Sequence, residues 1–244
     1  MKQAKCIILF VFIVVKTSFS QITTDNRQSY IGASIGIAPP IGTYANKNIY
    51  NAGAGFATLG MRFEGSIAKI IQRYWGIALN YKNQTNNINQ QTLSVLYAQK
   101  YGVTNCNIVG ITPWKINTFL IGSYNAIPLG DTKLVSLELK LLLGMMLATS
   151  PQTEITGVVG NNSFQSGQYA INAKAFAYSV GVGIRFEVSK TIFFILQGDC
   201  LGAKPKFKTS SIFPSLLSTP YSLNTSTQAI STLSFSICFA YRIN

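Results

Sequence analysis

The chain of 244 residues contains no histidine and only 7 acidic residues, and charged residues make up 11% of it. Without histidine, Ser/His/Asp hydrolysis, Cys/His proteolysis, histidine-ligated zinc and histidine acid–base catalysis are all excluded. Charge this sparse is unusual for a soluble domain. An apolar content of 48% and a mean hydropathy of +0.26 argue against disorder. We therefore expect a folded chain that is not an enzyme and carries no cofactor.

Cysteine is also scarce, with four in the whole chain. Cys6 falls within an apolar leader, and the remaining three, Cys106, Cys200 and Cys238, can form at most one disulfide. None of them has the close spacing of a metal-binding or redox pair. The sequence therefore predicts neither a disulfide framework nor a metal site.

The first twenty residues have the composition of a secretory signal peptide. Met1–Lys5 supplies two lysines, Cys6–Val15 is an unbroken apolar run, and Ser18 and Ser20 are small residues where a peptidase would cut. An uncleaved anchor helix would need about 17 to 25 apolar residues, and Lys16 ends the run too early. We expect a signal peptide over residues 1–20 and a single mature domain over residues 21–244.

Long apolar runs are missing from the rest of the chain. The nearest, Leu134–Leu147, is interrupted by Glu138 and Lys140, so a membrane-spanning helix is not expected. The pattern there is instead alternation with period two, which is typical of strands with one apolar face. Eight segments show it: 30–37, 57–64, 75–82, 116–124, 134–147, 176–187, 191–200 and 232–243. The facing stays open in two of them, because Phe119 adjoins Leu120 and Phe193 adjoins Phe194.

The connections between these segments alternate in length. Long polar stretches cover 39–53, 83–110, 150–170 and 201–228, whereas short turns fall around 66–73, 126–133 and 189–190. Long loops on one side and short turns on the other are typical of outer-membrane barrels. The sequence predicts an all-β fold, an eight-stranded antiparallel up-and-down transmembrane β-barrel.

The composition of the second strand face favours lipid outside the barrel. A soluble, lipocalin-like barrel would alternate equally well, but its outer face would carry many Lys, Glu and Thr residues. Here that face is mostly Gly, Ser, Ala and Asn, which suits a narrow lumen. Six aromatic residues fit the girdles expected at membrane interfaces: Tyr30, Phe63, Trp75, Tyr81, Phe186 and Tyr241.

A repeated motif places charge on the inward face. Gly60–Ser66 and Gly183–Ser189 match at five of seven positions, and Ala240–Asn244 is a looser third copy. We expect the charged residues of these motifs near the turn-side rim, in a structural ion network that plugs the lumen. A proton or ion path, or a site for a small anion, is the alternative. The predicted network comprises Arg62, Glu64, Lys82, Glu138, Lys140, Arg185, Glu187 and Arg242, with Asp199 as a further candidate.

Three lysines at the start of the last long loop form a basic row. Lys204, Lys206 and Lys208 alternate with Pro205 and Phe207, so they share one side of an extended segment. Lipopolysaccharide phosphates or other anionic lipid groups fit such a row, and a solvated rim is the alternative. An exported chain without a nucleic-acid-binding motif is not expected to bind nucleic acid.

The chain resembles small Gram-negative outer-membrane β-barrel proteins of the OmpA/OmpX-like class. The resemblance lies in the Gly-rich opening strand Tyr30–Gly36, the turn around Pro128 and the closing strand Ser236–Ile243. It implies residence in the outer membrane and a closing strand, with Phe239 and Tyr241, that is read by the barrel assembly machinery. The final Asn244 departs from the usual aromatic ending, and we expect no peptidoglycan-binding domain after the barrel.

The resemblance and composition together favour a non-enzymatic barrel. We expect a structural or surface-interaction role through the four long loops, with a surface or envelope protein as partner. The alternative is small-solute transport, or a part in an outer-membrane secretion apparatus. Barrel lipases and palmitoyl transferases use a histidine that this chain lacks.

Overall fold

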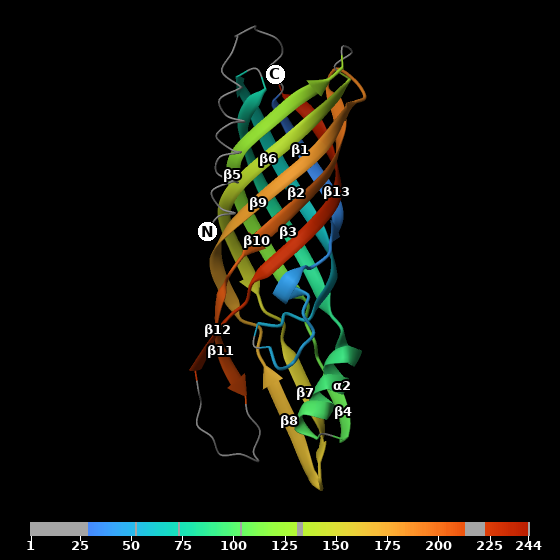
Figure 1. Cartoon of the computed structure of the whole chain (residues 1–244), viewed down its shortest axis with the longest axis vertical. Helices are drawn as coiled ribbons and strands as arrows, with labels where there is room; N and C mark the ends of the chain where they lie inside the picture. Colours follow the sequence, from blue (N-terminus) through green and yellow to red (C-terminus); the bar gives the residue numbers. More distant parts are fainter. Residues whose placement is uncertain are drawn as a thin grey trace, which may run out of the picture.

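Eight antiparallel strands close into a barrel in the computed structural model, which describes residues 29–51, 53–72, 74–102, 104–130, 134–212 and 223–243 (Figure 1). Successive barrel strands are neighbours, and β1 pairs with β13 to complete the wall. The predicted up-and-down barrel is confirmed. Its strands are β1 (Ser29–Ala38), β2 (Ala57–Gln72), β3 (Trp75–Ile88), β5 (Trp114–Leu129), β6 (Val135–Thr149), β9 (Asn172–Glu187), β10 (Ile192–Ala203) and β13 (Ile230–Ile243).

The predicted signal peptide over residues 1–20 lies outside the described residues, as does Asn244. No helix in the described part of the chain is long and apolar enough to cross a membrane.

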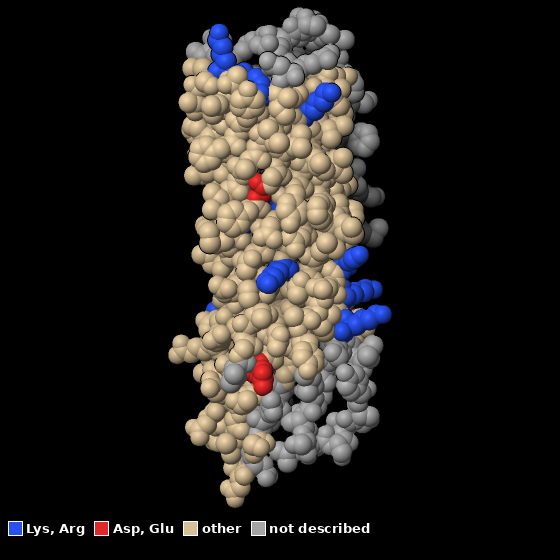
Figure 2. Space-filling model, turned by 180° about the vertical axis from the view of Figure 1, so that it is seen from behind, with Lys and Arg blue, Asp and Glu red and all other residues tan. Residues whose placement is uncertain are grey.

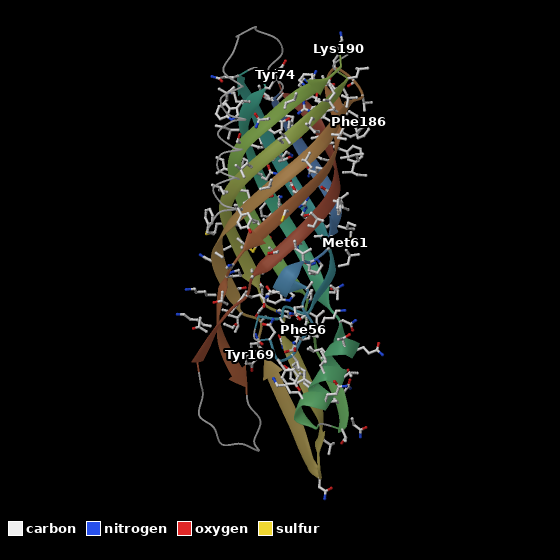
Figure 3. All side chains as sticks on the ribbon, viewed as in Figure 1. Phe56, Met61, Tyr74, Tyr169, Phe186 and Lys190 are labelled. Atoms are coloured by element: carbon white, nitrogen blue, oxygen red, sulfur yellow. The ribbon has the colours of Figure 1, made fainter. Side chains whose placement is uncertain are left out.

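The outer face of the wall is apolar. Along β9, Phe176, Tyr178 and Val180 are 65%, 48% and 53% exposed, while the intervening Ala177 and Ser179 are buried. Figure 3 shows Met61 and Phe186 pointing away from the barrel. In Figure 2 the middle of the wall carries almost no charged side chain, and Lys and Arg gather toward its two ends. Lipid, rather than water, is the favourable surrounding for such a wall.

The structure shows which residues face inward on the two strands whose facing the sequence left open. On β5, Phe119 is 49% exposed and Leu120 is 1% exposed, so Leu120 fills the lumen. On β10, Phe193 is 1% exposed and lies inside, whereas Phe194 stacks on Phe186 with ring centroids 4.9 Å apart. Each pair of adjacent apolar residues therefore divides between the two faces, as the period of a strand requires.

Several strands run further than the alternation predicts. Residues 66–72, expected in a turn, continue β2 and pair with β3, with a register irregularity between Ile70 and Gln72. The sequence pattern stops early because Gly65 and Lys69 take outward positions there and Ile70 an inward one, although the alternation of burial continues. The polar end of β3, Asn83–Ile88, is missed for another reason, because polar residues occupy both of its faces there.

Three of the long connections contain a second, five-stranded sheet that extends from one end of the barrel (Figure 1). We call this the loop end, and the opposite end, with the short connections, the turn end. A helix, α2 (Gln90–Tyr101), precedes the sheet, capped by Asn89, which accepts a hydrogen bond from Thr92 N, and by the left-handed Gly102. The sheet consists of β4 (Thr104–Val109), β7 (Thr153–Val159), β8 (Asn162–Gln168), β11 (Lys206–Ile212) and β12 (Leu223–Thr227), in the order β12-β11-β8-β7-β4.

Candidate functional site

The barrel lumen holds most of the charged residues that the sequence singles out, in two buried clusters. The first, the Asp199 cluster, comprises Asp199, Arg62, Lys82 and Glu64. Both Asp199 oxygens face the Arg62 guanidinium, at 2.7 and 2.6 Å, and Lys82 Nζ lies 2.7 Å from Asp199 Oδ1. Glu64 Oε2 is farther away, 3.4 Å from Arg62 and 3.8 Å from Lys82. Two cations and two carboxylates make the cluster electrically balanced.

Serine hydroxyl groups accept further hydrogen bonds from the cations of the Asp199 cluster. Arg62 donates to Ser234 Oγ at 2.6 Å and to Ser236 Oγ at 3.1 Å, and Lys82 donates to Ser179 Oγ at 3.0 Å. These serines are the small residues that alternate with apolar ones on β13 and β9. Both Arg62 Nη atoms and Lys82 Nζ are therefore engaged with groups of the barrel itself, whereas Arg62 Nε has no hydrogen-bond partner in the described chain.

The second cluster, the Glu138 cluster, comprises Glu138, Arg185, Lys140 and Tyr124. Arg185 lies 2.7 Å from Glu138 Oε1 through Nη2, and Tyr124 donates to the same oxygen at 2.8 Å. Arg185 also donates to the Tyr124 hydroxyl. Lys140 Nζ is 3.8 Å from Glu138 Oε2 and donates to Gln197 at 3.1 Å.

Aromatic rings fill the lumen beside the Glu138 cluster. The Arg185 guanidinium lies 4.1 Å from the ring centroid of Phe193 and 5.4 Å from that of Tyr30. Tyr30 packs edge-on against both Tyr124 and Phe193. Cation–π contacts of this kind favour a buried guanidinium. The girdle position predicted for Tyr30 is wrong, because Tyr30 has the inward parity of Gly32 and is fully buried.

Residues of the two clusters line a common cavity of about 10 Å³, which is about the space of one water molecule. Glu64 Oε2 and Glu138 Oε2, both on its lining residues, accept no hydrogen bond from the described protein. A space of this size separates the clusters without opening a path for a solute.

A third ion pair lies at the turn end. Arg242 Nη2 is 2.7 Å from Glu187 Oε1, with both side chains 15% exposed, and Arg242 also donates to the carbonyl of Lys190. This pair occupies the rim that the repeated motif predicts. Arg62 and Glu64 do not lie at that rim, contrary to the expectation, because β2 continues to Gln72 and places them within the strand.

An aromatic cap closes the loop end of the lumen. The described residues of the β1–β2 connection, 39–51 and 53–56, fold over the mouth, and the short 3-10 helix η2 (Gly42–Tyr44) inserts Tyr44 beneath it. Trp114 packs edge-on between Tyr44 and Phe207, with centroids 5.6 and 5.7 Å away, and donates from Nε1 to Gly55 O at 2.9 Å. Burial raises the pKa of the Tyr44 phenol well above its ordinary value, so the hydroxyl stays protonated and donates to Asn86.

The two-residue period of the strands correctly predicts that most network residues face inward, but it does not predict which of them form ion pairs with one another. The contacts of Tyr124 and Gln197 with the network were not predicted, because the network was identified from charged residues and these two side chains are neutral. Trp114 was missed because it falls between the predicted loop 83–110 and the predicted strand 116–124, and the role of Phe207 was missed because it lies in a segment predicted to be a loop. Lys204, Lys206 and Lys208 are exposed while Pro205 and Phe207 are buried, so the three lysines do share one side.

The outward aromatic residues are also placed. Phe239 and Tyr241, the expected assembly positions, are 65% and 55% exposed on the outer wall. Phe63 and Tyr81 are outward but lie in the middle of their strands, because β2 and β3 are longer than expected. Within the described residues, no group of three His, Cys, Asp or Glu side chains could hold a metal ion.

No protein-family model matches the chain. No curated protein sequence matches it. Among solved structures, the outer membrane protein OprG from Pseudomonas aeruginosa is similar at 12% identity and a TM-score of 0.48, over 92% of this chain and 100% of its own. Ail, the attachment invasion locus protein of Yersinia pestis, is similar at 11% identity and a TM-score of 0.44, over 90% of this chain and 100% of its own. Neisserial surface protein A is similar at 9% identity and a TM-score of 0.43, with the same coverage. Similarity at this level says nothing about what the chain binds.

Proposed function

We propose that this chain is a non-enzymatic outer-membrane barrel with a closed lumen, whose loop-end sheet and helix present a surface to a partner protein. The buried ion clusters within the lumen are the observation that carries the proposal. A barrel that passes nothing through its centre acts through its ends, and in the described part of the chain the additional sheet and helix lie at the loop end.

Residence in a membrane is supported by the outer wall. Apolar side chains cover it on all eight strands, and a wall of this kind would be strongly unfavourable in water. The closed strand order leaves no unpaired edge among the barrel strands, which a hydrocarbon surrounding demands. A leader with the features of a signal peptide would deliver such a chain out of the cytoplasm.

Closure of the lumen is supported at three levels. The Trp114 cap covers the loop end, the Asp199 cluster lies beneath it, and the Glu138 cluster with its aromatic rings lies toward the turn end. Side chains alone fill an eight-stranded barrel. Passage of a solute would require breaking buried ion pairs, each of which is costly to separate.

The interaction role is supported by the loop-end structure. The hairpin of β7 and β8 turns at Gly160 and pairs with β4 and β11, and no pairing joins it to a barrel strand in the described chain. Short, polar strands held on a rigid wall are well suited to contact a partner.

Two experiments test the proposal. In planar bilayers the folded protein should give no stable conductance steps, and regular steps would favour the transport alternative. The second experiment uses two variants of the β7–β8 hairpin. In one, a short turn replaces Thr153–Gln168. In the other, the length of that segment is kept but the order of its residues is scrambled. Because the β6–β9 pairing reaches Thr149↔Asn172 without the hairpin, the shortened chain should still fold and show heat-modifiable gel migration.

Cross-linking in isolated outer membranes then gives the decisive comparison. The wild type should yield a defined neighbouring protein, and the shortened and scrambled variants should lose it. If both variants keep the same neighbour as the wild type, the loop-end sheet is not the interaction surface.

A further inference from the structure

Five exposed lysines lie where the barrel passes into its loop end. Lys204, Lys206 and Lys208 come from the end of β10 and the start of β11, Lys174 from the start of β9, and Lys115 from the start of β5. Each is exposed and has at least one buried neighbour along the chain. We call these five residues the lysine arc.

Strand register makes the arc continuous. Ala203 pairs with Ala177, so the same register carried three residues further sets Lys206 opposite Lys174, and β11 does lie against β9. Lys174 in turn pairs with Leu147, whose other partner is Asn117, two residues from Lys115. The arc therefore follows one side of the barrel across β11, β9, β6 and β5.

The arc has no balancing carboxylate. In the described chain none of its five lysines forms an ion pair. Glu64, Glu138, Glu187 and Asp199 pair with cations of the lumen or its rim, and Glu154, the remaining described carboxylate, lies on β7 of the loop-end sheet. Five exposed positive charges on one side of the barrel repel one another, and anions from outside the chain would relieve that repulsion.

The position of the arc identifies those anions. Phe176 and Tyr178, outward residues of the apolar band, follow Lys174 directly along β9. A lysine at that boundary buries its aliphatic stem beside apolar surface and extends its ammonium group to the headgroup level. The opposite side differs, because outward residues at the loop end of β1 and β2 are Ile37, Leu59 and Met61.

We propose that the lysine arc binds the phosphate groups of anionic membrane lipids in the leaflet that surrounds the loop end. Binding is one-sided, because the arc covers only the β5–β11 side of the barrel. The proposal rests on residence in a membrane but not on the identity of any partner protein. Lysines near a membrane surface typically strengthen binding to anionic lipid about fivefold each.

The test uses a triple variant, Lys174→Gln, Lys204→Gln and Lys206→Gln. The control, Lys47→Gln, Lys69→Gln and Lys190→Gln, removes the same charge from exposed lysines elsewhere. Each full-length chain is folded in detergent, and native mass spectrometry measures retention of phosphatidylglycerol and phosphatidylcholine. We expect the arc variant to raise the dissociation constant for phosphatidylglycerol at least tenfold, and to leave phosphatidylcholine retention unchanged.

The control should keep the wild-type preference, and added salt should weaken it in the wild type. Equal losses in the two variants, or no loss in the arc variant, would overturn the proposal. Insertion into phosphatidylcholine vesicles is measured in parallel. A wild type that inserts there but shows no preference for phosphatidylglycerol refutes the arc alone, whereas failure of the wild type to insert refutes membrane residence.

Discussion

Replacing Asp199 with asparagine removes one carboxylate from the centre of the lumen and nearly preserves its shape. Arg62 and Lys82 are 0% and 2% exposed, and both approach Asp199 within 2.7 Å. At that distance each pair is worth roughly 6 kcal/mol of Coulomb attraction at an effective dielectric constant of about 20, most of it offset by desolvation. Removing one partner of a buried pair typically costs about 3 to 5 kcal/mol.

Glu64 sets the expected value near the lower end of that range. Its Oε2 lies 3.4 Å from Arg62 and 3.8 Å from Lys82, so it can partly compensate both cations after the substitution. We expect Asp199→Asn to lower the free energy of unfolding by about 3 kcal/mol. The measurement is urea unfolding of the barrel in lipid vesicles, followed by heat-modifiable gel migration.

Charge balance provides a second variant and a control. Asp199→Asn combined with Arg62→Met leaves one cation and one carboxylate, so this double variant should be more stable than Asp199→Asn alone. Glu187→Gln breaks the more exposed rim pair and should cost less than about 1 kcal/mol. An Asp199→Asn barrel as stable as the wild type would refute the ionic account of the lumen. So would a double variant less stable than Asp199→Asn alone.

Three other substitutions give distinct outcomes. Gly144→Val should destabilise the barrel by about 2 kcal/mol, because a Cβ there would clash with the Phe119 carbonyl, whereas Gly65→Val meets open space and should be neutral in the same unfolding assay. Trp114→Ala should cost about 3 kcal/mol and make residues 39–56 sensitive to protease, and an unchanged digestion pattern would count against the cap. Arg185→Leu leaves the carboxylate of Glu138 without its closest cation, so heat stability should fall while membrane localisation persists, and unchanged stability would argue against the network.

The strand faces could be predicted from sequence because their physical basis is local. Arg62 and Arg185 alternate with exposed apolar residues, and the period of a strand then places them inside. The same rule gives the inward position of Tyr30 through Gly32 and Ser34. The predicted girdle position of Tyr30 is wrong because it rested on an aromatic residue lying at a strand end, and not on the face that the two-residue period assigns to it.

Pairing and loop structure could not be predicted in this way. Asp199 meets Arg62 across 137 positions of sequence, and their contact depends on the stagger of the closed sheet. The loop-end strands are short and polar, so they lack the apolar alternation that reveals β9 or β13. The cap around Trp114 depends on strand pairing and on loop structure, because it joins a barrel strand to a residue of β11.

The two tryptophans of the chain allow a direct measurement of which face meets lipid. Trp75 is 36% exposed on the outer wall, and Trp114 is 6% exposed beneath the cap. Trp114→Phe and Trp75→Phe each leave a single emitter, and the two variants are folded into vesicles of bromine-labelled lipid. The account predicts strong quenching of Trp75 and almost none of Trp114. Equal quenching of both residues, or a barrel that stays folded and monomeric in buffer without lipid or detergent, would contradict it.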